Sequence, residues 1–300
     1  MSRSRLAFLL CFISVLMISG CSSSGMGNVD KKGKVLVYTS FYSLADFAKK
    51  IGGKHVIVKN MVPPGVEPHD FEPKIREMAP LSKADVFIYN GIGMESWINQ
   101  AKPMLEDGNA KVVNASQRIE AKVNHKKDPH VWLDPMKAKQ QAKAIEQALI
   151  KKDPRHKKEY EKNYALLSKR FDALDQKFKG IVKGSKQRTF ITSHAAFGHL
   201  ADRYGLTQVA VSGLSPSDEP SAKELQAVVQ KARKYKVHTI YFEELVSGKV
   251  AETVREEVGA RALTLSTLEG LTQKQKEAGE DYFSLMDKNV ENLAKGLNAN

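Results

Sequence analysis

The chain has few cysteines, and both lie close to its amino terminus. Among 300 residues only Cys11 and Cys21 carry a thiol. A chain that is processed at Cys21 therefore has no thiol left for an internal disulfide or for a thiolate metal site. Any metal that binds to the remaining sequence has to be held by histidine, aspartate or glutamate.

Long apolar runs are also scarce, and the one that stands out follows Arg3 and Arg5. Its sequence, LAFLLCFISVLMI, is short and close to the start of the chain, which predicts a signal peptide over residues 1–20. The run ends in ISGC, the pattern of a lipobox, so we expect Cys21 to become a lipid-modified first residue. The Ser- and Gly-rich residues that follow predict a flexible tether over 21–33 and disfavour a buried Cys21.

Acidic residues are outnumbered by basic ones, 34 against 47, and the formal net charge is +13. Such a charge suits nucleic-acid binding, but the lysines are scattered among glutamates along predicted helices, and no module of aromatic and basic residues stands out. We therefore expect no nucleic-acid partner. The excess charge is interpreted as solvated helix surface that favours an anionic membrane or cell wall.

Apolar, β-branched runs alternate with amphipathic segments in both halves of the chain. This order favours right-handed βαβ units and an α/β fold of two lobes, each with a four-stranded, mainly parallel sheet flanked by helices. The predicted strands are 34–40, 55–62, 84–91 and 111–116 in the first half, and 188–193, 207–214, 237–244 and 260–266 in the second. Helices are expected to begin near Leu44, Pro73, Glu95, Ala195, Ser221 and Ser247.

A helical stretch separates the two halves. Asp134 is placed to cap a helix that begins at Pro135, and a second helix follows the break at 153–155. Its apolar positions form one continuous face, which favours a long rigid helix packed along both lobes over a short coiled-coil dimer seam. These positions are Tyr164, Leu167, Phe171, Leu174, Phe178 and Ile181. The expected domain limits are 34–134 for the first lobe, 135–184 for the linking helices and 185–300 for the second lobe.

Three histidines follow predicted strands. His69 lies in the proline-rich loop PPGVEPHDFEP, and His194 directly follows strand 188–193. His130 lies in DPHVWLDP, where Pro129 extends the residue before it and the cap of the next helix limits the loop. The two Asp-Pro steps are thus predicted to fix the orientation of the His130 imidazole. Trp132 is predicted to be buried beneath it, in the core or in the lobe interface.

A carboxylate is expected to complete the group. Glu269 lies just past the last predicted strand, while Glu243 and Glu244 end the third strand of the second half and are its main competitors. His199 lies about 140° around a helix from His194, so we assign it to packing or to the surroundings of the site. The remaining histidines are placed elsewhere: His55 and His238 begin strands, and His125 and His156 are expected to be exposed.

All four candidates fall at the carboxyl ends of parallel strands, where open α/β sheets bind ligands. Two facing lobes would therefore bring His69, His130, His194 and Glu269 into one cleft. Three imidazoles and one carboxylate suit tetrahedral zinc, whereas manganese prefers more oxygen ligands. A catalytic zinc keeps an open coordination position, so four protein ligands favour binding over hydrolysis and predict that the protein is not an enzyme.

The chain resembles a known family along essentially its whole length. Its lipobox, PHDFEP, DPHVWLDP, SHAAFGHLADRYGL, SGLSPSDEPSAKEL and the segment beginning LEGLTQKQ are similar to those of the zinc-type solute-binding lipoproteins of bacterial ABC metal importers. The resemblance implies two lobes joined by a long rigid helix, and a Zn(II) ion between them as the transported ligand. It also implies a lipid anchor on the extracytoplasmic face of the cell membrane, and delivery to an ABC permease driven by a cytoplasmic ATPase.

Carried over residue by residue, the resemblance implies the ligands His69, His130, His194 and Glu269. Residues expected to support or replace them are Asp70, Asp134, His199 and Glu243, and the protein is expected to act as a monomer. Manganese-type relatives have a carboxylate where His194 stands, so His194 favours zinc. The short segment NHKKDPH replaces the long His-rich loop of many zinc members. A manganese importer component, an extracellular zinc hydrolase and a metal-stabilised surface adhesin lipoprotein remain the alternatives.

Overall fold

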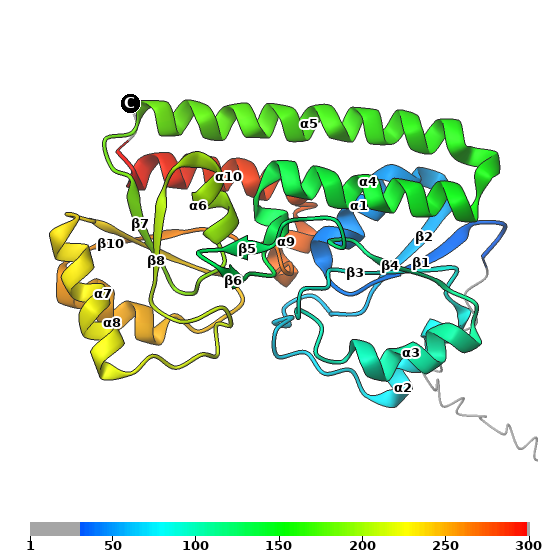
Figure 1. Cartoon of the computed structure of the whole chain (residues 1–300), viewed down its shortest axis with the longest axis horizontal. Helices are drawn as coiled ribbons and strands as arrows, with labels where there is room; N and C mark the ends of the chain where they lie inside the picture. Colours follow the sequence, from blue (N-terminus) through cyan, green and yellow to red (C-terminus); the bar gives the residue numbers. More distant parts are fainter. Residues whose placement is uncertain (1–30, 299–300) are drawn as a thin grey trace, which may run out of the picture. The chain divides into compact units, whose positions relative to one another are not determined.

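Two four-stranded parallel sheets organise residues 31–298, the part of the chain that the computed structural model describes (Figure 1). The first has the order β2-β1-β3-β4 and the second the order β10-β9-β7-β8, with every neighbouring pair parallel, as predicted. The strands are β1 (Val35–Thr39), β2 (Val56–Asn60), β3 (Val86–Tyr89), β4 (Lys111–Asn114), β7 (Thr189–Thr192), β8 (Thr207–Ala210), β9 (Thr239–Phe242) and β10 (Arg261–Thr264). The predicted signal peptide, Cys21 and most of the predicted tether lie outside the described residues.

Six helices begin within three residues of their predicted starts: α1 (Tyr42–Gly52), α2 (Ile75–Met78), α3 (Ile98–Asp107), α6 (Gly198–Tyr204), α7 (Ala222–Lys234) and α8 (Lys249–Val258). Two further helices, for which no start was predicted, are α9 (Gln273–Glu277) and α10 (Tyr282–Gly296). The capping box predicted at Ser221 opens α7. Helix α3 begins later than expected because Glu95 is used in the preceding turn. Its buried carboxylate accepts hydrogen bonds from the amides of Asn90 and Gly91, at 2.7 and 3.0 Å.

A small antiparallel hairpin, which the sequence did not predict, precedes His130. Its strands are β5 (Lys122–Val123) and β6 (Lys126–Lys127). The two turn residues, Asn124 and His125, have φ angles of 49° and 67°, as a two-residue turn with both central residues left-handed requires. The short NHKK segment is therefore an ordered turn, and His125 is exposed at its tip, as predicted.

Two helices link the sheets, as predicted. The Asp134 carboxylate caps α4 (Pro135–Lys152) by accepting from the amide of Met136 at 2.8 Å. Helix α5 (Lys157–Gly184) has 28 residues and is therefore about 42 Å long at 1.5 Å per residue. Its buried apolar side chains are Tyr160, Leu167, Phe171, Leu174, Phe178 and Val182. Tyr164 and Ile181, also predicted on this face, are partly buried against the same core.

The apolar face of α5 is covered within the chain. The Phe171 ring lies 5.4 Å from Phe47 of α1 and 5.0 Å from Phe283 of α10. Helix α1 packs beside the first sheet and α10 beside the second, so α5 is fixed to helices of both lobes (Figure 1). A coiled-coil seam would need this face to be free, so that alternative is wrong.

Among residues 31–298, no helix combines the length and the apolar character that crossing a membrane requires.

Candidate metal centre

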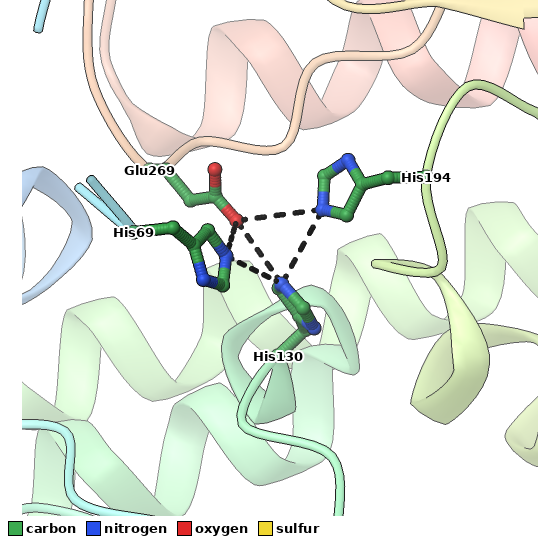
Figure 2. Close-up of side chains that lie close together, drawn as sticks. All are labelled: His69, His130, His194 and Glu269. Carbon is green, nitrogen blue, oxygen red and sulfur yellow. Dashed lines mark hydrogen bonds and ion pairs between the residues drawn. The ribbon is translucent and has the colours of Figure 1, made fainter. Parts of the chain in front are cut away.

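The four residues singled out as ligands lie together (Figure 2). His69, His130, His194 and Glu269 each offer one nitrogen or oxygen atom, and these four atoms all lie within 4.8 Å of one another. The Nε2 atom of His130 lies 3.1 Å from that of His69 and 3.4 Å from that of His194. The Oε1 atom of Glu269 lies 3.3 Å from His69, 3.2 Å from His130 and 3.9 Å from His194.

These separations have the size of a tetrahedral coordination sphere. Four ligand atoms bound at about 2.0–2.1 Å from a zinc ion are about 3.3–3.4 Å apart along the edges of the tetrahedron. Four of the five separations given above lie within 0.3 Å of that range, and only that between His194 and Glu269, at 3.9 Å, is longer. The arrangement thus fits a small divalent cation once the separation between His194 and Glu269 shortens.

Loops at the carboxyl ends of strands carry three of the four residues. His69 follows β2, His194 follows β7 and Glu269 follows β10, while the β5–β6 hairpin intervenes between β4 and His130. The side chains of His130, His194 and Glu269 are fully buried, whereas that of His69 keeps 11% of its surface exposed. Of the four side chains, that of His69 is thus the one that solvent contacts.

Two carboxylates hold imidazole rings by the nitrogen that faces away from the cluster. Asp128 lies 2.8 Å from Nδ1 of His130, and Glu243 lies 2.6 Å from Nδ1 of His194. Because each carboxylate accepts the proton on Nδ1, Nε2 is turned into the cluster, and in the neutral ring its lone pair is free to bind a cation. Glu243 therefore supports a ring and does not face the cluster itself. Glu244, the other competitor, accepts a hydrogen bond from Gln275 at 3.0 Å.

Two acidic residues at the site, Asp128 and Glu67, were not predicted from the sequence. Asp128 was considered only as the residue that Pro129 extends. The Oε1 atom of Glu67 accepts a hydrogen bond from the amide of His69 at 3.1 Å. Its Oε2 is buried and has no hydrogen-bond partner. Burial, followed by the negative charge of Glu269, raises the pKa of Glu67 to about 9. The signal available was an acidic residue two positions before His69 and before His130.

The charges within the cluster are strongly coupled. Burial alone would lower the pKa of His130, but its hydrogen bonds to Asp128 and Glu269 outweigh burial and raise the pKa to about 10. Burial would likewise raise the pKa of Glu269, yet hydrogen bonds from His130 and His69 hold it well below its usual range. In the metal-free protein a protonated imidazole therefore neutralises the buried Glu269 carboxylate.

The other residues predicted to support the site form hydrogen bonds with groups outside the four ligand residues. Asp70 is exposed and accepts a hydrogen bond from the Ser217 hydroxyl at 3.2 Å, between loops of the two lobes. Asp134 caps α4 and lies 3.4 Å from Nε of Arg203. His199 is buried, as its assignment to packing requires. His156 was expected to be exposed, but it is half-buried because its ring stacks on His55, with the centroids 3.6 Å apart.

The segment that carries Glu269 is anchored on the first lobe. The amide of Tyr42 donates to the Glu269 carbonyl at 3.3 Å, and the Ser43 hydroxyl donates to the Leu268 carbonyl at 2.7 Å. The indole of Trp132 donates to the Thr267 carbonyl at 2.7 Å. We predicted two candidates from each lobe, and by chain order this holds. The segment that carries Glu269 follows β10 of the second sheet, but it is also hydrogen-bonded to the first lobe, whereas His194 directly follows β7.

The comparisons with known proteins agree with this chemistry. Residues 37–296 match the protein family described as "Zinc-uptake complex component A periplasmic". The chain is 38% identical to the high-affinity zinc uptake system protein ZnuA of Bacillus subtilis, over 96% of this chain and 95% of that protein. It spans 56% to 60% of the length of the streptococcal zinc-binding proteins AdcA that it also matches.

Solved structures show the same fold. The Zn(II)-bound ZnuA-like domain of Streptococcus pneumoniae AdcA superposes with a TM-score of 0.78 at 36% identity, covering 88% of this chain and 99% of that one. The laminin-binding protein Lmb of Streptococcus agalactiae, described as having adhesin and metal-transporting activity, gives a TM-score of 0.81 at 32% identity, with coverages of 88% and 99%.

Proposed function

The chain belongs to the zinc-uptake complex component A family, and on this basis we propose that it captures Zn(II) outside the cytoplasm and delivers it to an ABC permease. The proposal includes the ligands His69, His130, His194 and Glu269, which bind the ion in the cleft between the lobes. The observation that carries it is the convergence of three ring nitrogens and one carboxylate oxygen within 4.8 Å of one another.

The donor set favours zinc over manganese. Three neutral imidazoles and one carboxylate suit a four-coordinate ion, whereas manganese takes more oxygen ligands. The buried carboxylates that approach the imidazoles, Asp128 and Glu243, are hydrogen-bonded to their Nδ1 atoms and are thus committed to orienting them. Glu67 is the exception, and its raised pKa keeps it a neutral acid at neutral pH in the metal-free protein.

Binding without hydrolysis is supported by the number of ligands. A zinc ion held by all four residues keeps no open position for a water nucleophile, so the site suits capture of the ion rather than catalysis. We further propose that Cys21 anchors the protein through lipid to the extracytoplasmic face of the membrane. In this proposal the protein acts as a monomer with lobes at 34–134 and 185–300, and its ATPase partner acts through the permease.

Zinc titration of the purified protein in competition with a chelator tests the binding step, together with an X-ray absorption edge that identifies the bound ion. We expect one tightly bound zinc per chain and a preference for zinc over manganese. His194→Asp places the carboxylate typical of manganese-type members at that position, so this variant should lose part of the preference. Equal affinity for the two metals in the unaltered protein would contradict the proposal.

Deletion of the gene in its own bacterium tests delivery. We expect slow growth in zinc-poor medium that added zinc restores and added manganese does not. Restoration by manganese would favour the manganese importer, and unchanged growth with reduced attachment to laminin would favour the adhesin.

A further inference from the structure

One side chain connects the lobe that carries His194 to the loop that carries His130. His199 lies on α6, which begins four residues after His194, and only 1% of its surface is exposed. Its Nε2 atom lies 2.9 Å from the backbone carbonyl oxygen of Asp128, and its Nδ1 atom lies 2.7 Å from Nζ of Lys137. Asp128 precedes His130 in the first half of the chain, and Lys137 lies on α4.

These two contacts fix the tautomer of His199. A lysine ammonium only donates hydrogen bonds, so Nδ1 has to accept one, and the ring proton is left on Nε2. Nε2–H then donates to the carbonyl oxygen of Asp128, which only accepts. Burial lowers the pKa of His199, in keeping with a neutral ring.

The backbone of α6 also lies against the carboxylate of Asp128. A Cβ atom at Gly198 would approach Oδ2 of Asp128 to 2.6 Å, so only glycine leaves room for this contact. Helix α6 thus touches Asp128 twice, at its carbonyl through His199 and at its carboxylate through Gly198. The same carboxylate orients the His130 ring through Nδ1.

We propose that His199 is a positioning residue that sets the separation between His194 and His130, now 3.4 Å between their Nε2 atoms. The loops of His69 and His130 are each hydrogen-bonded to the segment that carries Glu269, through the amide of Gly65 to the Leu271 carbonyl and through the indole of Trp132 to the Thr267 carbonyl. His194 lies in the loop between β7 of the second sheet and α6. The hydrogen bond from His199 to Asp128 holds α6 and this loop against the first lobe. The inference rests on the proposed zinc site and names the residue that assembles it.

Two substitutions separate the two contacts of His199. Glutamine places its amide nitrogen about where Nε2 lies, so His199→Gln keeps the hydrogen bond to the Asp128 carbonyl. Asparagine is shorter and places its amide oxygen about where Nδ1 lies, so His199→Asn keeps the contact with Lys137 and loses the one with Asp128. Both variants retain a small, neutral, polar side chain. His238→Gln, at an exposed histidine far from the site, serves as the matched control.

Zinc affinity is measured for each variant by chelator competition. Loss of a residue that orients a metal ligand typically weakens binding by about 10- to 100-fold. We expect a loss of that size for His199→Asn, less than about tenfold for His199→Gln, and no change for His238→Gln. Equal affinities for the Asn and Gln variants would overturn the proposal.

A double-mutant cycle with His194→Ala distinguishes positioning of His194 from a general effect of His199 on stability, because it measures whether the two substitutions affect zinc affinity independently. If His199 positions His194, removing His194 should cost less affinity in the His199→Asn protein than in the unaltered protein, by about tenfold. Independent effects of the two substitutions would overturn the proposal even if His199→Asn lowered the thermal midpoint. Failure of the unaltered protein to bind zinc would instead reject the proposed function, which keeps the two conclusions distinguishable.

Discussion

The Nε2 atoms of His69 and His130 face each other across 3.1 Å, and the Glu269 carboxylate lies 3.3 and 3.2 Å from them. Two unprotonated ring nitrogens at this distance would oppose their lone pairs, so either a proton or a cation has to lie between them. The site is therefore one in which protons and metal ions compete for the same atoms.

Zinc affinity should rise with pH. His130 has a pKa raised to about 10 in the metal-free protein, so at neutral pH a zinc ion has to displace its proton. Each displaced proton makes affinity change by about tenfold per pH unit below that pKa. Calorimetry at pH 7.4 in buffers with different ionisation enthalpies should show the release of at least one proton per zinc. Binding heats that do not depend on the buffer would contradict this.

The metal-free protein should lose stability as pH rises above neutral. The pKa of His130 is raised to about 10, so its stabilising contribution is complete below about pH 6.5 and is lost as pH rises through about 10. Glu67, with a pKa raised to about 9, also takes up a proton on folding and acts in the same direction from about pH 4.5 upward. Urea unfolding of chelator-treated protein at pH 7, 8 and 9 should show a falling free energy of unfolding.

Glu67→Gln provides the control for that trend, because the amide mimics the neutral acid. In this variant the decline between pH 7 and 9 should be shallower than in the unaltered protein. An identical slope would show that Glu67 does not titrate in this range.

Removal of the carboxylate in the cluster should have a larger effect than removal of its competitor. Glu269→Gln removes the charge that three imidazoles surround, and we expect zinc affinity to fall by more than about 100-fold, beyond the loss typical of residues that only orient ligands. Glu244→Gln changes a carboxylate that accepts from Gln275 outside the cluster, so affinity should stay nearly constant. The reverse order would make Glu244 the fourth ligand.

Trp132→Phe should weaken both the fold and the site. The indole is fully buried and donates to the Thr267 carbonyl, two residues before Glu269. The substitution leaves that carbonyl without its donor and opens space beneath His130, at a cost of about 2–4 kcal/mol in the free energy of unfolding. Trp97→Phe, in the separate cluster with Phe87, should cost stability without changing zinc affinity. Equal affinity losses in both variants would show that the anchoring contact is unimportant.

The sequence predicted the strands, the linking helices and the four clustered residues, because each follows from local pattern. Alternating apolar runs locate βαβ units, and parallel strands bring their carboxyl ends to one edge. The roles of Asp128 and Glu67 were missed because an acidic residue near a histidine is common, and only tertiary contacts show which nitrogen it meets. Tyr42 and Ser43 anchor the segment of Glu269 through contacts between parts of the chain that are far apart in sequence. The local spacing of apolar residues does not predict such contacts.

The fluorescence of Trp132 should report whether the metal site is occupied. Its indole ring lies 5.3 Å from the ring of His130, close enough for a charged imidazolium to quench the emission of the indole. Trp97, the other tryptophan, packs against Phe71 and Phe87 and supplies a steady background. When an ion replaces the proton, the brightness of Trp132 should change, and a stopped-flow fluorimeter can then follow filling and emptying of the unlabelled protein in real time.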